Sequence, residues 1–259
     1  MSDPKYHPVV AIDMDGVLRL PPTRPGSPAR DLISAEITYR SDAFPTLHHS
    51  EPPWDENGEY TDEDGEEFSR TGVEWVHDLL RRDIDVVWAT TWQHHANTYF
   101  SPVLGLPELP VAIVGDGSRF EDPLFWKAAE LSSDPRWVGR PLMWVDDDIP
   151  VGWAIENRRR PKDRALTLSF RVGSPWDGLR AREVVELDAW LTLASAPEGH
   201  AELRRRRRRR SQQVRRAAER RRERRHVERR QTCGIARRSR ARSPLRISVR
   251  SLPMYDANE

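Results

Sequence analysis

The chain has 259 residues, enough for one domain of ordinary size and an additional segment. Its formal net charge of +1 conceals two opposite parts, because residues 1–203 carry 20 Lys and Arg against 36 Asp and Glu, whereas residues 204–259 carry 22 Arg against 5 acids. The single cysteine, Cys233, excludes an internal disulfide and a thiolate metal cluster, and no apolar stretch approaches the roughly 20 residues of a membrane span. We therefore expect a soluble protein of the reducing cytoplasm that has no membrane partner.

The first predicted strand, Val9–Ile12, is followed by Asp13-Met14-Asp15-Gly16. Side chains two residues apart on an extended segment point the same way, so the carboxylates of Asp13 and Asp15 converge on one small volume. Two like charges that close require either a hard cation such as Mg²⁺ or protonation of one acid. Gly16 permits a sharp turn beneath a ligand. The alternative is a strand end with two solvated acids.

The segment between Gly16 and Thr71 is too long for an ordinary loop. Within it Ile33–Tyr39 is compatible with a strand, and nine acids lie between Glu51 and Glu67. We interpret these acids as a solvated segment. So many negative charges close to a binding site would repel a long polyanion.

A helix and a second strand follow this segment. Thr71-Gly72-Val73-Glu74 has the spacing of a capping box and predicts the start of a helix that packs on the sheet. Val86–Ala89 is an apolar run that predicts a strand, and it ends in the hydroxyls of Thr90 and Thr91. A hydroxyl at this position can donate a hydrogen bond to a phosphoryl oxygen, but it can equally be a strand-end or helix-cap residue.

Another predicted helix places a lysine near its start. Asp122 suits the N-cap and Pro123 suits the first turn, so Lys127 lies close to the helix N-terminus. The chain has only two other lysines, and the choice of lysine among so many arginines favours a function for Lys127. The alternative is a solvated helix lysine.

Leu142–Val145 predicts a further strand, closed by Asp146-Asp147-Asp148. Oxygen ligands in that number suit Mg²⁺, although an acidic turn has the same composition. Val111–Val114 and Ala165–Phe170 also predict strands, and Arg182–Leu191 predicts a helix. Strands alternating with helices indicate an α/β fold with a mostly parallel sheet.

Ligands of open parallel sheets bind at the carboxyl ends of the strands. Asp13, Thr90 and Asp146 each follow directly on a predicted strand. The topology therefore brings these three residues to the same edge of the sheet.

The order Asp-x-Asp-Gly, strand-Thr, Lys and strand-Asp-Asp resembles the four motifs of the haloacid dehalogenase (HAD) superfamily of phosphohydrolases. Finer features resemble the branch found as a domain of multidomain RNA-repair proteins; they are Trp88-Ala89-Thr90-Thr91-Trp92, Ala96-Asn97, Leu104-Gly105-Leu106-Pro107, Trp144-Val145-Asp146-Asp147 and Gly178-Leu179. The resemblance implies a Rossmann-like, HAD-like domain over about residues 7–193, with a small cap inserted after the first strand at about residues 19–70.

The resemblance also implies roles for individual residues. Asp13 would be the nucleophile that takes the phosphoryl group as an aspartyl-phosphate, and Asp15 would protonate the leaving oxygen and then activate water. Thr90, or its neighbour Thr91, would hold a phosphoryl oxygen, and Lys127 would offset the charge gathered on nucleophile and phosphate.

The same resemblance implies a magnesium site. Asp147, assisted by Asp146, would hold Mg²⁺ together with Asp13 and the backbone carbonyl of Asp15. The metal and the lysine are both needed, because a carboxylate approaches a dianionic phosphate only when their repulsion is screened. Gly16 would lie beneath the substrate.

Residues 204–259 contain too little apolar material to fold alone and predict a disordered basic tail. This tail is an arm for nucleic acid, a strap across the acidic domain, a solvated segment with no dedicated role, or a reading-frame artefact.

The expected activity is Mg²⁺-dependent hydrolysis of a phosphomonoester, with a nucleotide or nucleic-acid phosphate end as first substrate. The alternatives are a small-metabolite phosphatase and a non-catalytic HAD-fold protein that binds through its basic tail.

Overall fold

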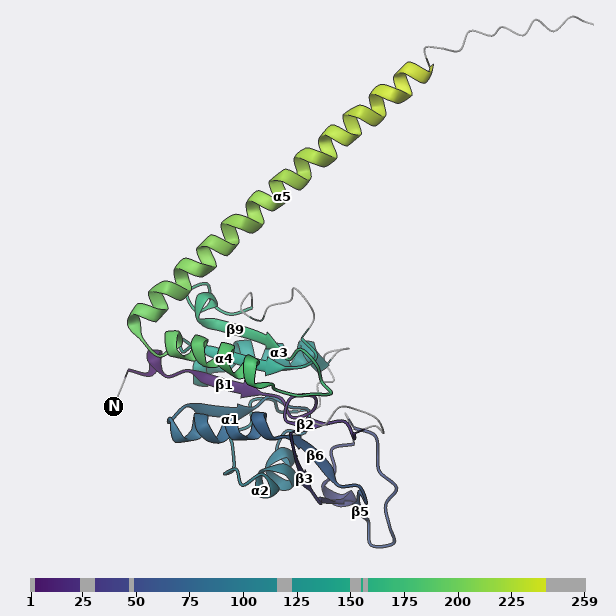
Figure 1. Ribbon diagram of the computed structural model, residues 1–259, viewed down its shortest axis with the longest axis vertical. Helices are drawn as coiled ribbons and strands as arrows, with labels where there is room; N and C mark the ends of the chain where they lie inside the picture. The colour runs from purple at the N-terminus through teal and green to yellow at the C-terminus, as the bar shows by residue number, and fades with distance from the viewer. Residues whose placement is uncertain are drawn as a thin grey trace, which may run out of the picture. The chain divides into compact units, whose positions relative to one another are not determined.

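The computed structural model describes residues 3–23, 31–46, 49–115, 123–149, 155 and 158–240, and the side chains of 123–124 and 223–240 lie outside this description. The chain divides into two units, Met1–Arg207 and Arg208–Glu259. The strands described below all belong to the first unit (Figure 1).

A parallel sheet of four strands forms the centre of the first unit. Its order is β7 (Asp85–Trp88), β1 (Val9–Ile12), β8 (Leu142–Asp146) and β9 (Thr167–Arg171), and all three pairings are parallel. Every residue of β1 and β8 is buried, as expected for strands covered on both faces. The predicted α/β fold with a mostly parallel sheet is therefore confirmed.

Two predicted strands differ from the structure. Val111–Val114 forms no strand among the described residues, because only Val111 bridges to Trp88. Pro110 lacks the N–H that a longer ladder needs at this point. The last strand begins at Thr167 rather than Ala165, since a 3₁₀ turn occupies Arg164–Leu166.

Helices cover both faces of the sheet. On one face α1 (Arg70–Arg81) and α4 (Ala181–Ala194) pack against Val10 and Ile12. On the other face α3 (Pro123–Ser133) packs against Val9 and Ala11. Successive residues of β1 thus point to opposite apolar layers, as the two-residue period of a strand requires.

The start of α1 differs from the predicted capping box. Its N-cap is Ser69, whose Oγ accepts a hydrogen bond from Gly72 N at 3.1 Å, so the helix begins before Thr71. Ser69 also donates to the carbonyl of Leu179 at 3.0 Å, which ties the helix start to the loop before α4. Asp122, the predicted cap of α3, lies outside the described residues.

The segment between β1 and α1 contains two small antiparallel sheets. One has the order β2 (Arg19–Leu20), β6 (Glu66–Ser69), β3 (Leu32–Ala35), and the other pairs β4 (Thr38–Arg40) with β5 (Glu59–Thr61). The single strand predicted over Ile33–Tyr39 is therefore two, each paired with a different partner. We call residues 19–69 the insertion.

The described part of the first unit also contains short helical turns. They are Pro4–Tyr6, Ser41–Ala43, Pro135–Trp137 and Arg164–Leu166 (3₁₀), Ala96–Phe100 (a π-helix) and α2 (Ser101–Val103). The π-helix lies close to the carboxyl end of β7 in sequence and carries Tyr99 and Phe100, whose rings contact Trp92.

The last helix, α5 (Pro197–Arg240), begins in the first unit. Leu203 packs with Leu166 and Ala194, and His200 Nε2 lies 2.7 Å from the carbonyl oxygen of Ala194. Where composition predicts disorder from Arg204 on, the structure describes a helix as far as Arg240, and residues 241–259 lie outside the described residues. Arg, Ala, Gln and Glu are among the best helix formers, so this segment needs no apolar core to adopt helical backbone geometry.

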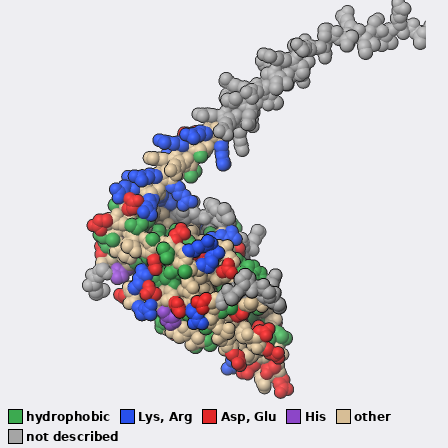
Figure 2. All heavy atoms as spheres, in the orientation of Figure 1, with side chains coloured by type: hydrophobic (Ala, Val, Ile, Leu, Met, Phe, Trp, Pro, Cys, Tyr) green, Lys and Arg blue, Asp and Glu red, His purple; other side chains and the backbone are tan. Residues whose placement is uncertain are grey.

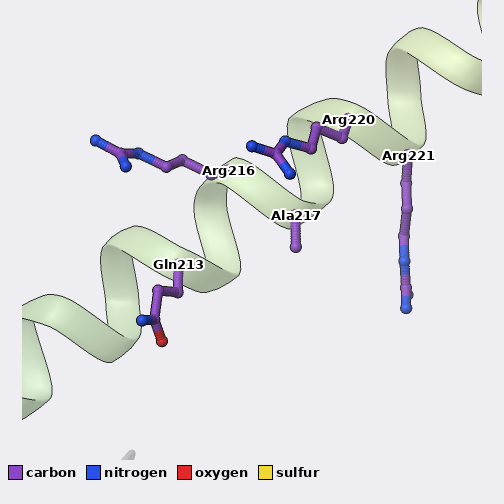
Figure 3. A pocket seen from close by; sticks show the side chains of 5 residues that line it. All are labelled: Gln213, Arg216, Ala217, Arg220 and Arg221. Carbon is purple, nitrogen blue, oxygen red and sulfur yellow. The ribbon is translucent and has the colours of Figure 1, made fainter.

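Between Arg204 and Arg222, the exposed surface of α5 is dominated by arginine, shown in blue in Figure 2. Figure 3 shows Gln213, Arg216, Ala217, Arg220 and Arg221 along two turns of this helix. No helix among the described residues is both long enough and apolar enough to cross a lipid bilayer.

Candidate active site

The carboxyl ends of β1 and β8 place two acids side by side. Ile12 pairs with Val145 in the parallel ladder, and Asp13 N donates to the carbonyl of Val145 at 3.0 Å. Asp13 follows β1 directly, and Asp146 is the last residue of β8. Both side chains are buried, Asp146 completely. The edge of the sheet predicted to bind a ligand therefore carries a pair of buried carboxylates.

Lys127 of α3 lies between these two acids. Its Nζ is 2.5 Å from Oδ2 of Asp13 and 2.9 Å from Oδ2 of Asp146, and its side chain is only 8% exposed. Burial by itself lowers the pKa of Lys127, but the two carboxylates outweigh it and raise that pKa above its ordinary value. The lysine is thus an ammonium ion enclosed by carboxylates. Removing one partner from such a buried group typically costs about 3–5 kcal/mol.

Asp147 extends the pair to a group of three acids. Asp13, Asp146 and Asp147 each offer a carboxylate oxygen, and these oxygens lie within 4.8 Å of one another. Burial, followed by the charge of Asp146, raises the pKa of Asp147 to about 6. Burial also raises the pKa of Asp13 well above its ordinary value, opposed by the ammonium of Lys127.

Three carboxylates around one ammonium ion leave an excess of negative charge in a largely buried volume. Oxygen donors alone, without histidine or thiolate, are the ligand set of a hard cation such as Mg²⁺. The residues present therefore fit a divalent metal ion. Asp148 lies outside the group, because its side chain is exposed. Its backbone N–H donates to Oδ1 of Asp146 at 2.9 Å.

Gly16 forms the turn that passes over Asp147. Its φ is +69°, in the left-handed region that favours glycine, and a Cβ atom at this position would lie 2.3 Å from Oδ2 of Asp147. The turn closes through hydrogen bonds from Gly16 N to the carbonyl of Arg19 and from Leu18 N to that of Met14. The absence of a side chain at Gly16 thus makes room for the Asp147 carboxylate.

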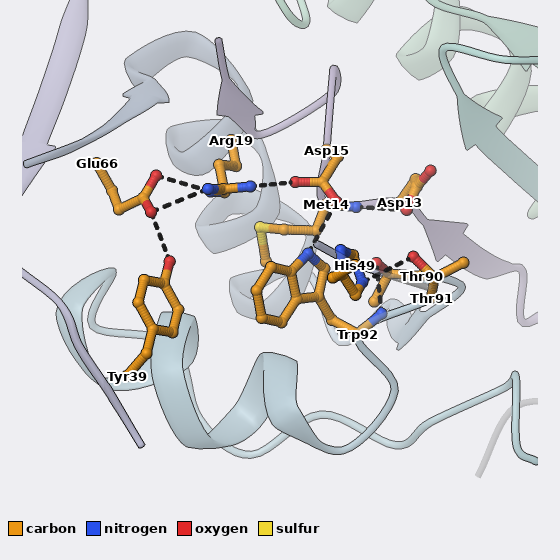
Figure 4. A network of polar contacts seen from close by, with 10 residues as sticks. All are labelled: Asp13, Met14, Asp15, Arg19, Tyr39, His49, Glu66, Thr90, Thr91 and Trp92. Carbon is orange, nitrogen blue, oxygen red and sulfur yellow. Dashed lines mark hydrogen bonds and ion pairs between the residues drawn. The ribbon is translucent and has the colours of Figure 1, made fainter. Parts of the chain in front are cut away.

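Asp15 is held by two donors from different elements, as Figure 4 shows. Its Oδ1 accepts from Arg19 Nη1 at 2.8 Å, and its Oδ2 accepts from the indole Nε1 of Trp92 at 2.8 Å. The Asp15 side chain remains 41% exposed. Because both oxygens are engaged, the carboxylate has a defined orientation while it stays open to solvent.

Arg19 is in turn held by Glu66, another residue of the insertion. Its Nε and Nη2 donate to the two oxygens of Glu66 at 2.7 and 2.9 Å, and the hydroxyl of Tyr39 donates to Oε1 of Glu66 at 2.6 Å. Burial tends to lower the pKa of Arg19, but its bonds to Glu66 and the charge of Asp15 raise it above the ordinary value. Tyr39, Glu66, Arg19, Asp15 and Trp92 form one continuous polar chain, which we call the Asp15 clamp (Figure 4).

The two threonines after β7 lie in different surroundings. Thr90 is fully buried, and its Oγ1 accepts from Trp92 N at 3.3 Å. Thr91 is partly exposed, and its Oγ1 lies 3.2 Å from Nε2 of His49 in the insertion. Both hydroxyls therefore already have partners within the chain, and the His49 ring lies 4.2 Å from that of Trp92, centroid to centroid.

Asp13, Lys127, Asp146 and Asp147 were predicted to belong to one site, and the structure brings these four side chains together. The Asp15 clamp was not predicted, because Glu66 lies 47 residues from Arg19 and Tyr39 lies in another strand of the insertion. In the sequence, Arg19 has no feature that separates it from a surface arginine. Its position four residues after Asp15, across a tight turn, is the only local signal.

No family model matches this chain, and no curated protein or solved structure matches it either. What the site can do chemically therefore follows from its own geometry. That geometry supplies a buried carboxylate beside an ammonium ion, a group of acids suited to a divalent cation, and a second, solvent-accessible carboxylate held by the clamp.

Proposed function

We propose that this protein is a magnesium-dependent phosphomonoester hydrolase with a HAD-like, Rossmann-like domain, in which the insertion is the cap. The observation that supports it best is the buried group of Asp13, Lys127 and Asp146 at the carboxyl ends of parallel strands, with Asp147 beside it. Asp15 and Gly16, which follow Asp13, complete the motif whose resemblance to phosphohydrolases the sequence indicates.

Asp13 is the nucleophile in this proposal. One of its carboxylate oxygens forms a bond to phosphorus while the bond from phosphorus to the ester oxygen breaks, which leaves an aspartyl-phosphate and an alcohol. Lys127, 2.5 Å from Asp13, keeps positive charge beside the nucleophile as the negatively charged phosphate approaches.

Asp15 provides proton transfer in both halves of the reaction. Its acid form gives a proton to the departing ester oxygen, and the carboxylate then takes a proton from the water that attacks the aspartyl-phosphate, which releases phosphate and restores Asp13. The Asp15 clamp orients the carboxylate for both steps. Thr90 or Thr91 holds a phosphoryl oxygen in this scheme. To do so, the hydroxyl would have to exchange its present partner, Trp92 N for Thr90 or His49 for Thr91, for the substrate.

The metal would be held by Asp13, Asp146 and Asp147, with the backbone carbonyl of Asp15. When bound, Mg²⁺ supplies the charge that screens the repulsion between carboxylate and phosphate dianion. The excess negative charge of the three acids is the feature of this chain that favours such an ion.

A nucleotide or a nucleic-acid phosphate end is the first substrate class, and a small phosphorylated metabolite is the second. The non-enzymatic alternative is a protein of the same fold that binds a ligand through its basic tail and catalyses no reaction. The full set of acids and the buried lysine favour turnover over that alternative, since a purely binding protein has no need of a charged, buried group that is costly to assemble.

The test is a screen of the full chain for phosphate release from nucleoside monophosphates, sugar phosphates and phosphate-ended oligonucleotides, with Mg²⁺ and with a chelator. We expect turnover of at least one class with Mg²⁺ only. Asp13→Asn should abolish it because an amide is a poor nucleophile. Asp42→Asn, which alters an exposed ion pair of the insertion, is the matched control. Near wild-type turnover by a folded Asp13→Asn variant would contradict the assignment, and the absence of turnover for every class would favour the binding protein.

A further inference from the structure

The part of α5 that follows Leu203 carries an unusual density of positive charge. Between Arg204 and Arg222, 12 of 19 residues are arginine and one, Glu219, is acidic. All of these residues except the partly buried Arg207 are exposed. This segment is distinct from the candidate active site, and its chemistry is not used by the proposed reaction.

The arginines surround the helix. Successive residues of an α-helix are rotated by about 100°, so the seven arginines Arg204–Arg210 alone complete almost two turns. Arg216 and Arg220, four residues apart, project from neighbouring turns, whereas Arg221 projects in another direction (Figure 3). No face of this segment is free of positive charge, and a stripe of apolar residues is lacking.

Few of these charges are neutralised by the side chains that the structure describes. Glu202 pairs with Arg205 and Arg206, each at 2.9 Å. Among the residues whose side chains the structure describes, none of the eight arginines between Arg208 and Arg222 forms an ion pair; they are Arg208, Arg209, Arg210, Arg215, Arg216, Arg220, Arg221 and Arg222. Like charges at neighbouring helical positions repel one another, so a partner that supplies closely spaced negative charge would stabilise this helix.

The distribution of charge selects among anionic partners. A membrane-surface helix needs an apolar face to insert, and the exposed valine of this segment, Val214, stands alone among charged and small side chains. An acidic protein surface would engage one side of the helix only. A groove lined by phosphates on both walls, in contrast, meets arginines on several sides at once.

We propose that the arginine-rich part of α5, residues 204–222, binds double-stranded nucleic acid by lying in its major groove. Nineteen helical residues span about 27 Å and carry about one net positive charge per 2.5 Å, against about one phosphate per 1.7 Å of duplex axis. The major groove of B-form DNA, about 12 Å wide, admits an α-helix. The contacts are to phosphates, so binding has little dependence on sequence. This inference does not rest on the proposed hydrolase activity.

The experiment uses the full chain and a fluorescent DNA duplex of about 24 base pairs, with anisotropy measured over a range of salt concentrations. In one variant the eight arginines between Arg208 and Arg222 become glutamine, and in the matched control the same eight become lysine. Glutamine and lysine are both good helix formers, and circular dichroism checks that the helix is retained.

We expect the glutamine variant to lose at least about 100-fold in affinity and the lysine variant to stay within about fivefold, since lysine keeps the phosphate contacts. The dependence of log affinity on log salt should become shallower by about 0.9 for each phosphate contact removed. Unchanged affinity in the glutamine variant, or binding that salt does not weaken, overturns the proposal.

Two further probes identify the partner class. Polyglutamate of matched charge tests for any acidic polymer, and vesicles rich in anionic phospholipid test for a membrane surface. Weaker binding of both than of the duplex supports the proposal. Equal binding of polyglutamate assigns the segment to acidic polymers in general, and preferential binding of vesicles assigns it to a membrane, and either result overturns a nucleic-acid partner.

Discussion

Gly16 lies so close to Asp147 that a Cβ atom at position 16 would be 2.3 Å from Asp147 Oδ2. The turn after the first strand and the acid after β8 are therefore fitted to each other, although 131 residues separate them in the chain. Because Asp147 belongs to the acid group that suits a divalent cation, the proposed metal site depends on a residue without a side chain.

Gly16→Ala should weaken Mg²⁺ binding by at least about tenfold, because the methyl group displaces the Asp147 carboxylate, in addition to a backbone cost of about 1 kcal/mol at positive φ. Gly139→Ala is the matched control, since Gly139 has φ +81° and nothing within 4 Å of its Cβ position. A Mg²⁺ titration of activity and of the melting temperature measures both effects. An equal loss of Mg²⁺ affinity in the two variants would show that backbone strain alone is responsible.

Asp147→Ala should weaken Mg²⁺ binding much more than Asp148→Ala, because Asp147 contributes an oxygen to the acid group and the exposed Asp148 side chain does not. The backbone bond from Asp148 N to Asp146 survives both substitutions. Isothermal titration with Mg²⁺ compares the two without relying on turnover. If Asp148→Ala is the more damaging change, the position of the proposed metal site along this loop is displaced by one residue.

Disruption of the Asp15 clamp should slow turnover without weakening Mg²⁺ binding. Tyr39→Phe removes the hydroxyl that donates to Glu66, and Arg19→Lys removes the bidentate contact with Glu66 and changes the support of Asp15. We expect kcat for alkyl phosphates to fall by about 10-fold to 100-fold, which is part of the roughly 100-fold to 10,000-fold that a positioned general acid contributes, and kcat for activated aryl phosphates to fall less.

Arg40→Lys is the control for the clamp variants, because Arg40 pairs with Asp42 on the exposed surface of the same insertion. Equal loss on alkyl and aryl phosphates would argue against a role in proton transfer. A drop in melting temperature with unchanged kcat would mean that the network serves stability only.

Protonation of His200 should contribute to loss of stability in acid. Burial lowers the pKa of His200 below its ordinary value of 6.5, and Arg204 and Lys5 act in the same direction, although the bond to Ala194 opposes them. The unfolded chain therefore binds this proton more readily, so the free energy of unfolding falls as the pH falls below about 6.5. Above that pH, His200 leaves the free energy of unfolding independent of pH.

His200→Gln should show a smaller decrease in the free energy of unfolding between about pH 7 and pH 5 than the wild type, even if its stability at neutral pH is lower. Urea unfolding at several pH values measures the difference. His94→Gln, at an exposed position, controls for the loss of one histidine. An identical pH dependence in wild type and His200→Gln would exclude His200 as the origin.

Local sequence was sufficient to predict a strand wherever the segment's apolar composition already indicates burial. The runs that became β1, β7 and β8 are short, apolar and bounded by polar residues, and a fully buried parallel strand needs little more than that. Boundaries that depend on a distant partner were wrong or displaced. Ser69 caps α1 in place of Thr71 because its hydroxyl also bonds the carbonyl of Leu179, and Val111–Val114 lacks a strand partner beyond one bridge.

For the site, local sequence is enough to predict which acids end which strands, because a carboxylate after an apolar run has to emerge at the sheet's edge. Three relationships arise from the tertiary structure alone: Lys127 lies between Asp13 and Asp146, Gly16 makes room for Asp147, and Glu66 and Tyr39 support Asp15 through Arg19. These contacts join residues far apart in the chain. They follow from the register of the parallel strands and the path of the insertion, and no local pattern of side chains encodes either.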